Sequence, residues 1–286
     1  MLYWRAMRFL TFLARRFVAG ESLEEALGVV RDLNAEGLRV TLDHLGEDTS
    51  SPEQAARDVR EYCRMLEALH RQKADANVSL KLTQLGLGFS PKLARENLAL
   101  VLDQARRNGN FVRIDMEGSA FTSATLDLYR DIRAEYPDVG VVIQAMLRRS
   151  AADVEALVGA KGRVRLCKGA YKEPPELAWP DKADVNAAYD RLAERLLDAP
   201  APAFATHDED RIRRVVAAAD RRGIRRASYE IQMLYGLRAA RWRSLRDEGH
   251  AVRVYVPYGT HWLPYFYRRL RERKENIYFV VKNIFG

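Results

Sequence analysis

The chain has 286 residues, of which 48% are hydrophobic, and a formal net charge of +8. A chain of this length can bury a full core, as two small domains or as one α/β barrel, and no Ser/Gly/Pro-rich linker divides it. Scattered arginines are typical of a solvated surface, so we expect no nucleic-acid partner. Two cysteines are too few for a disulfide framework or a zinc site. No run is long and apolar enough to cross a bilayer and no secretory signal is apparent, which favours a cytoplasmic protein.

The first twenty residues predict a basic amphipathic helix with an apolar stripe that runs from Tyr3 to Phe17. Such a helix suits a membrane surface, a subunit contact or packing on its own domain, and the sequence does not choose between them. Ser22 and Glu25 then have the spacing of a capping box, which predicts a second helix that ends near Ala35.

From residue 38 onward, short apolar runs alternate with amphipathic helical patterns. Eight such strand-like runs with a helix after each argue for a (β/α)₈ TIM barrel, with a doubly wound open sheet as the alternative. We therefore assign residues 1–36 to an N-terminal helical segment and 37–286 to a catalytic barrel. The predicted strands are 38–42, 78–82, 111–114, 139–143, 164–166, 203–205, 226–230 and 252–256, and the predicted helices are 52–72, 91–108, 122–136, 151–158, 183–197, 208–222 and 234–248.

The final passage of the chain combines a strand with a cationic helix. The strand 252–256 is followed by Pro257, which we expect to end it, and a helical pattern begins near His261. Helical spacing places Tyr265, Arg268 and Arg269 on one stripe. That stripe could lie in water, or its paired arginines could grip a carboxylate or phosphate.

Polar groups follow nearly every predicted strand. The chemistry of a barrel lies where its strands finish, and a buried barrel interior should not tolerate so many polar groups. We therefore expect these side chains to ring one mouth and to bind each other or a ligand. They are Asp43, His44, Lys81, Gln84, Asp115, Glu117, Gln144, Arg165, Lys168, Thr206, His207, Glu230, Gln232 and Tyr255.

The type of ligand is only partly indicated by local motifs. The glycine motif of dinucleotide-binding proteins is not completed after Gly88, and no histidine pair has metal-ligand spacing. The segment RVRLCKGAY, residues 163–171, places a lysine beside small residues and suits a pyrophosphate. A Schiff-base aldolase using Lys81 or Lys168 is the competing enzyme, and an arginine-rich RNA-binding protein is the non-enzyme alternative.

A set of separated motifs in order resembles the proline dehydrogenases, flavin-dependent enzymes of proline catabolism, and in particular their short single-function bacterial type. These motifs cover most of residues 38–276. They are SLKLTQLG at 79–86, RIDMEG at 113–118, IQAML at 143–147, RLCKGAY at 165–171, ATHD at 205–208, YEIQMLYG at 229–236, and YVPYG followed by YFYRRLRE, which ends at 272.

The resemblance implies that FAD lies across the barrel mouth and that the last helix covers that mouth, while an extra helix, residues 22–35, fills the ordinary eighth position. It places Arg165 near the flavin N5, where a cation favours the reduced ring. The cofactor-binding residues that it implies are Met116, Gln144, Arg165, Lys168, Gly169, Ala170, Tyr171, Thr206 and His207.

The resemblance also implies how L-proline is held. Lys81, Arg268 and Arg269 would bind the carboxylate, Tyr255 and Tyr265 would wall the ring, and Leu234 would supply an apolar contact. Asp115, Arg165 and Tyr255 are the expected catalytic residues, with Asp115 near the substrate amine. Hydride would pass from C5 to the flavin N5 to give Δ1-pyrroline-5-carboxylate.

The family further implies two partners beyond proline. A membrane quinone would reoxidise the flavin, and a separate pyrroline-5-carboxylate dehydrogenase would receive the product. The resemblance leaves open whether the protein touches the inner face of the plasma membrane.

Overall fold

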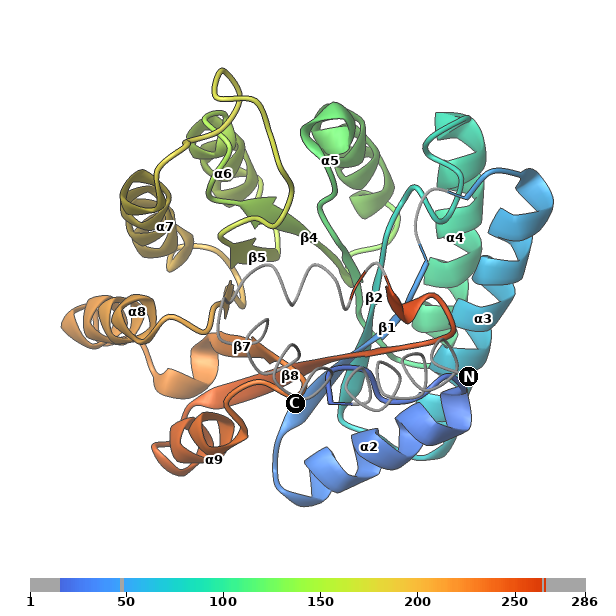
Figure 1. Cartoon of the computed structure of the whole chain (residues 1–286), viewed down its shortest axis with the longest axis horizontal. Coiled ribbons are helices and arrows are strands. Elements are labelled where there is room, and N and C mark those ends of the chain that lie inside the picture. Colours follow the sequence, from blue (N-terminus) through green and yellow to red (C-terminus); the bar gives the residue numbers. More distant parts are fainter. Residues whose placement is uncertain (1–15, 47–48, 264, 266–286) are drawn as a thin grey trace, which may run out of the picture.

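The fold is a closed barrel of eight parallel strands in the computed structural model, which describes residues 16–46, 49–263 and 265 (Figure 1). The strands follow one another around the barrel in chain order, and the last pairs with the first. The strands are β1 (Arg39–His44), β2 (Ala76–Leu80), β3 (Val112–Ile114), β4 (Val139–Gln144), β5 (Val164–Cys167), β6 (Ala203–Ala205), β7 (Glu230–Leu234) and β8 (Ala251–Tyr258). The (β/α)₈ prediction is confirmed.

Helices form an outer ring around this barrel (Figure 1). The first of those described, α2, begins after the predicted capping box, in which Ser22 accepts from the Glu25 backbone, and it packs against β1 and β8. It therefore covers the seam between the last strand and the first. The helices are α2 (Leu23–Ala35), α3 (Pro52–Arg71), α4 (Pro91–Arg107), α5 (Ser119–Arg133), α6 (Ser150–Gly159), α7 (Lys182–Leu196), α8 (Glu209–Arg221) and α9 (Ala239–Asp247).

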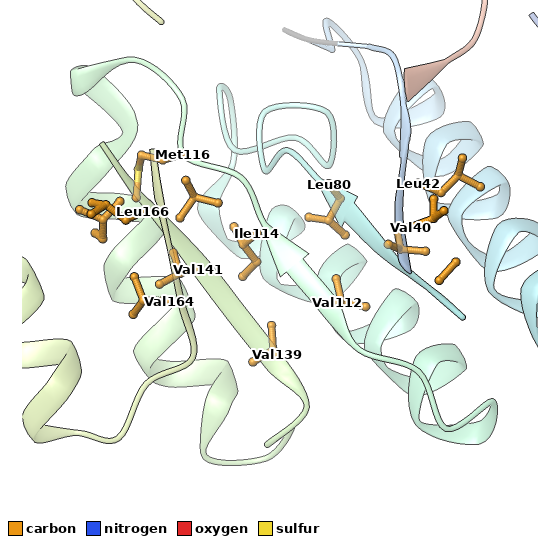
Figure 2. Close-up of a cluster of buried hydrophobic side chains, with 14 of the residues drawn as sticks. Val40, Leu42, Leu80, Val112, Ile114, Met116, Val139, Val141, Val164 and Leu166 are labelled. Atoms are coloured by element: carbon orange, nitrogen blue, oxygen red, sulfur yellow. The ribbon is translucent and has the colours of Figure 1, made fainter. Parts of the chain in front are cut away.

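The hydrophobic core lies between the strands and the helices. Successive strand side chains point to opposite faces, and on β1 the apolar Val40 and Leu42 are fully buried in the main core cluster. The same alternation recurs on the neighbouring strands, whose apolar side chains appear together in Figure 2. The other face of each strand points into the barrel and is free to carry polar groups.

That inner face is polar and buried, which corrects the expectation that a barrel interior excludes such groups. Thr41 and Ser79 are completely buried, and Arg165 is 4% exposed. Their contacts join β1, β2 and β5, strands that are not all neighbours, so the hydrogen bonds cross the lumen. The interior tolerates these groups because they bind one another.

Two boundary predictions near the C-terminus are wrong. Residues 226–230 were predicted as a strand, but Arg226–Ser228 is a 3-10 turn and β7 runs from Glu230 to Leu234, so the next helix begins at Ala239 rather than at residue 234. Pro257 does not end β8. Proline lacks the N–H of a ladder, but its carbonyl accepts from Ala19, and the strand continues to Tyr258.

Two predicted helices fall mostly outside the described residues. They are the basic helix that starts the chain and the cationic helix after His261, with Arg268 and Arg269. The division at residue 36 stays a prediction, although α2 contributes Leu27 and Leu33 to the same core as the barrel strands.

Candidate active site

The carboxyl ends of the strands surround a cavity of about 750 Å³, which we call the mouth cavity. Every described residue that the resemblance assigned to catalysis, proline or the cofactor lines it, whereas Arg268 and Arg269 lie outside the described residues. The lining residues are Lys81, Asp115, Met116, Gln144, Arg165, Lys168, Gly169, Ala170, Tyr171, Thr206, His207, Leu234, Tyr255 and Tyr265.

Arg165, on β5, forms the floor of the mouth cavity. Its Nε donates to Oε1 of Gln232 at 2.6 Å, and its Nη1 donates to Oδ1 of Asp115 at 2.8 Å. Weaker contacts reach Ser79 at 3.2 Å and Thr41 at 3.4 Å. Hydrogen bonds to residues on, or directly after, four other strands therefore fix the plane of this guanidinium group.

Gln232 is itself held in one orientation. Its Nε2 donates to Oε2 of Glu230 at 2.7 Å, so its Oε1 is the atom that faces Arg165. Because an amide has one donor end and one acceptor end, Glu230 fixes which end Arg165 meets. A hydrogen-bonded path thus runs from the base of β7 to the floor of the mouth cavity.

Asp115 and Tyr255 meet on the other side of Arg165. The Tyr255 hydroxyl donates to Oδ2 of Asp115 at 2.8 Å, and the guanidinium carbon of Arg165 lies 5.5 Å from the centre of the Tyr255 ring. Burial, followed by the charges of Asp115 and Asp43, raises the pKa of Tyr255 well above its ordinary value. Tyr255 is therefore a neutral hydrogen-bond donor in this site, not a base.

Asp43 and Lys81 form a buried ion pair, with 3.2 Å between Nζ and Oδ2. Asp43 is completely buried. Burial raises the pKa of Asp43 to about 6, while the charge of Lys81 acts in the opposite direction. Lys81 thus presents its ammonium group to the mouth cavity from a fixed position.

Lys168 is anchored by two residues that sequence reasoning did not single out. Its Nζ lies 2.6 Å from Oδ2 of Asp208 and 2.6 Å from Oδ1 of Asn186. Burial alone would raise the pKa of Asp208, but the hydrogen bond and charge of Lys168 lower it below its ordinary value. Asp208 was visible as the last residue of the ATHD motif, whereas nothing in the sequence indicated Asn186 on α7.

The turn after β5 requires glycine at position 169. Gly169 has a φ of +115°, and a Cβ there would lie 2.4 Å from Sδ of Met146. Only glycine adopts this conformation without strain. The turn consequently presents bare backbone between Lys168 and Ala170 to the mouth cavity.

The next two strand ends are joined by His207. The backbone N–H of Leu234 donates to Nε2 of His207 at 3.1 Å, so this nitrogen is the acceptor. Thr206 accepts from the N–H of Asp208 at 3.0 Å and shapes the turn before α8. Both residues lie where the sequence placed them, at the carboxyl end of β6.

Some residues expected at the mouth lie elsewhere. The placement of Glu230 was wrong, because it begins β7 instead of ending a strand, and it binds Arg253 at the opposite end of the barrel. His44, Gln84 and Glu117 do not line the cavity either. Gln84 accepts from Tyr62 at 2.7 Å, and Glu117 accepts from the backbone of Thr83 at 3.1 Å.

Across the described residues, no group of His, Cys, Asp and Glu side chains has the arrangement of a metal site. Within the same part of the chain, no helix combines the length and apolarity that a membrane span needs.

A parallel (β/α)₈ barrel with a charged cavity at the carboxyl ends of its strands, a buried arginine at the floor and a glycine turn beside a lysine has the architecture of a barrel enzyme. The sequence signature of the family described as "Proline dehydrogenase" matches residues 26–282. Proline dehydrogenase 1 of Bacillus subtilis subsp. natto is 41% identical over 272 residues, which cover 95% of this chain and 90% of that protein. The proline dehydrogenase of Deinococcus radiodurans is 38% identical over 281 residues, with the same coverage. The chain therefore belongs to the proline dehydrogenase family.

A solved structure gives the same fold. Proline utilization A from Bdellovibrio bacteriovorus, inactivated by N-propargylglycine, superposes with a TM-score of 0.86 at 28% identity and covers 92% of this chain. The chain spans 32% of the length of that protein. The near full-length match to the single-function relatives confirms the enzyme class that the motifs indicated, proline oxidation in proline catabolism.

Proposed function

We propose that the mouth cavity holds FAD and L-proline, and that the chain oxidises L-proline to Δ1-pyrroline-5-carboxylate as the first step of its breakdown to glutamate. Bound FAD supplies the acceptor, N5, for the hydride from C5 of proline, and a quinone takes the electrons afterwards. The observation that best supports this proposal is the convergence of Arg165, Asp115 and Tyr255 at the floor of the mouth cavity in a member of this family.

The cavity wall has the chemistry that a flavin dinucleotide needs. The bare turn at Gly169 and the ammonium group of Lys168 suit the pyrophosphate, since both offer donors to an anion. Arg165 is positioned to stabilise negative charge on a reduced ring. The remaining proposed contacts to the cofactor are Met116, Gln144, Ala170, Tyr171, Thr206 and His207.

We assign the proline carboxylate to Lys81, Arg268 and Arg269. Lys81 is held in place by Asp43, so its charge is pre-organised for an incoming carboxylate. Tyr255, Tyr265 and Leu234 form walls of the same cavity and suit the pyrrolidine ring. Charged hydrogen bonds of this kind contribute about 1.5–3 kcal/mol each, which is enough to select an amino acid with a free carboxylate.

Proton handling falls to groups near the substrate amine. Proline binds as a cation at nitrogen and must lose that proton before the imine forms. Asp115 accepts from both Arg165 and Tyr255, so it is a charged, fixed acceptor at the floor of the cavity. We assign an electrostatic and orienting role to Asp115 and Tyr255.

The same cavity is less suited to a Schiff-base aldolase. A Schiff-base lysine must lose its proton, but Lys81 and Lys168 each bind a carboxylate, at 3.2 Å and 2.6 Å. An amine held in an ion pair at this distance is not free to attack a carbonyl carbon. Failure of borohydride to trap a substrate adduct on either lysine is the expected result.

Product and electrons leave for separate partners in this proposal. The electron acceptor is a membrane quinone, reached by contact with the inner face of the plasma membrane, and the product passes to a pyrroline-5-carboxylate dehydrogenase. Reduction of a soluble quinone analogue by proline, catalysed by the purified protein, is the assay for the first partner.

The experiment that tests the cofactor is analysis of the purified protein. We expect yellow protein that releases FAD on denaturation, together with a product that reacts as a cyclic imine when proline and an acceptor are added. A colourless protein that takes up no FAD in reconstitution would exclude the proposal.

The carboxylate assignment is tested by Arg269→Met. We expect the KM for proline to rise roughly 10- to 150-fold, because one charged hydrogen bond is lost, while FAD stays bound. Arg271→Met is the control, since helical spacing places Arg271 off the stripe of Tyr265, Arg268 and Arg269. An unchanged KM in Arg269→Met would remove this residue from the carboxylate site.

A further inference from the structure

A second cavity, of about 590 Å³, lies at the amino ends of the strands, opposite the mouth. We call it the basal cavity. Arg39 and Glu230 begin β1 and β7 in its wall, and Arg113 and Arg253 reach it from within β3 and β8. Its size is in the range of small-molecule pockets, and it shares no lining residue with the mouth cavity.

The wall of the basal cavity is strongly cationic. Two carboxylates line it, Asp75 and Glu230, and both are engaged by arginines of the same wall. Against them stand five side chains that carry positive charge, but one of the five, Arg163, is also paired with Asp138 at 3.2 Å, which leaves an excess of two. The five are Arg39, Lys73, Arg113, Arg163 and Arg253.

Arg113 is the most deeply buried of these five cations. It is 3% exposed and forms no ion pair within the described residues. Its Nη1 donates to the carbonyl of Arg163 at 2.7 Å, but its Nε has no acceptor in the same part of the chain. Burial, and then repulsion from Arg165, lowers the pKa of Arg113 to about 9. A buried cation without a carboxylate partner is costly unless something else supplies the charge.

The cationic groups are also held rigidly. The guanidinium carbons of Arg113 and Arg163 lie 4.7 Å and 4.1 Å from the centre of the same ring, that of Phe111. Stacking on one aromatic ring fixes both forks, and a fixed fork suits a planar or tetrahedral oxyanion.

We propose that the basal cavity binds a phosphate group, either as the free ion or as the monoester of a small hydroxylated molecule. Phosphate is favoured over a carboxylate because it offers more acceptor oxygens and up to two negative charges, which match the stacked guanidinium groups of Arg113 and Arg163 and the excess charge of the wall. The cavity is larger than the ion alone, so it has room for the ester portion.

Calorimetric titration of the purified holoprotein tests this proposal. The probes are inorganic phosphate and glycerol 3-phosphate, in a buffer free of phosphate and at a constant ionic strength set with sodium chloride. We expect Arg113→Leu to weaken the affinity for both probes at least about tenfold, because charged hydrogen bonds are lost. Tighter binding of glycerol 3-phosphate identifies the monoester as the preferred form, and equal binding identifies the ion.

A substitution at the rim keeps the test valid if Arg113→Leu does not fold. Lys73 lines the cavity, is exposed and has a φ of 51°. We expect Lys73→Glu to weaken phosphate binding severalfold or more, because it reverses one charge of the wall. Lys161→Glu is the matched control, since Lys161 is also exposed, with a φ of 55°, but lies outside the cavity.

Phosphate could also bind at the lysines and the arginine of the mouth cavity, and proline kinetics separate the two sites. Binding in the basal cavity predicts that phosphate does not compete with proline at constant ionic strength. Either competition with proline or an affinity unchanged by both Arg113→Leu and Lys73→Glu would overturn the proposal.

Discussion

At the residue scale, Arg165 is the group on which the floor of the mouth cavity depends. It joins Asp115 to Gln232, and through Gln232 it is tied to Glu230 at the base of the barrel. A guanidinium group that hydrogen bonds hold in one orientation does not need to reorient when charge develops nearby. Both its electrostatic effect and the position of Asp115 should therefore be sensitive to its removal.

We predict that Arg165→Met lowers kcat/KM for proline roughly 10- to 150-fold, equivalent to the 1.5–3 kcal/mol of a charged hydrogen bond. It should also make the reduction potential of the flavin more negative, because a positive charge that favours the reduced ring is lost. Steady-state kinetics and a potentiometric titration measure the two effects.

Arg113→Met is the control for this variant. Arg113 is also buried inside the barrel, but it lines only the basal cavity. It should change the flavin potential and the KM for proline little, whereas an equal loss in both variants would show that any buried arginine has the same effect.

The free energy of unfolding should depend on pH through Glu230. Burial alone would raise its pKa, but the charge and hydrogen bonds of Arg253 lower the pKa of Glu230 from 4.5 to about 2. A carboxyl with a depressed pKa in the folded state stabilises the fold above pH 4.5, and this stabilisation is lost as the pH falls toward 2.

We therefore expect wild type to exceed Glu230→Gln in free energy of unfolding by on the order of 3 kcal/mol near pH 6, and the difference to shrink between pH 4.5 and 2. Urea unfolding at several pH values measures it. Glu209→Gln, a substitution in a surface ion-pair network on α8, is the matched control, and a constant difference for Glu230→Gln would contradict the assignment.

At the scale of elements, the turn between β5 and α7 is shaped by one glycine. Gly169→Ala places a methyl group against Met146 in a backbone conformation that alanine rarely adopts. We predict a loss of stability of about 1–3 kcal/mol and a lower FAD content, because the backbone that we propose as a cofactor contact must move. Flavin absorbance per mole of protein measures the second effect.

Gly223→Ala separates strain from cofactor binding. Gly223 also has a positive φ, +64°, but nothing lies within 4 Å of the added Cβ. This variant should lose about 1 kcal/mol of stability with an unchanged FAD content. If both variants keep FAD equally well, the turn at Gly169 is not a cofactor contact.

Helix α2 closes the barrel at the seam of β1 and β8, so its apolar face should support the whole fold. Leu33 on this helix is 5% exposed, whereas Leu100 on α4 is 55% exposed. We predict that Leu33→Ala costs about 2–5 kcal/mol in free energy of unfolding and that Leu100→Ala stays within about 0.5 kcal/mol of wild type. Equal effects in a urea titration would show that α2 is not part of the core.

On the scale of the whole molecule, the barrel could be predicted because its helix-facing residues are apolar at every strand. Val40 and Leu42 show this on β1, and their pattern repeats at the same spacing on β2, β3 and β5. The predicted strand ends were enough to identify most residues of the mouth cavity, because parallel strands bring their carboxyl ends to one side of the barrel.

What the sequence could not show is where β7 begins and what lies inside the lumen. Glu230 was placed at the end of a predicted strand, 226–230, but Arg226–Ser228 forms a 3-10 turn. The cross-lumen bonds of Arg165, and the anchoring of Lys168 by Asn186, join residues far apart in the chain. Such pairings depend on closure of the barrel, which no local pattern encodes.

The central claim is that the mouth cavity brings C5 of proline to a bound flavin for hydride transfer. Anaerobic mixing of the holoprotein with L-proline, unlabelled or deuterated at C5, measures this step in a single turnover. The account predicts complete loss of the oxidised flavin absorbance, with slower loss for the deuterated substrate. A flavin that stays oxidised in the presence of saturating proline would contradict it.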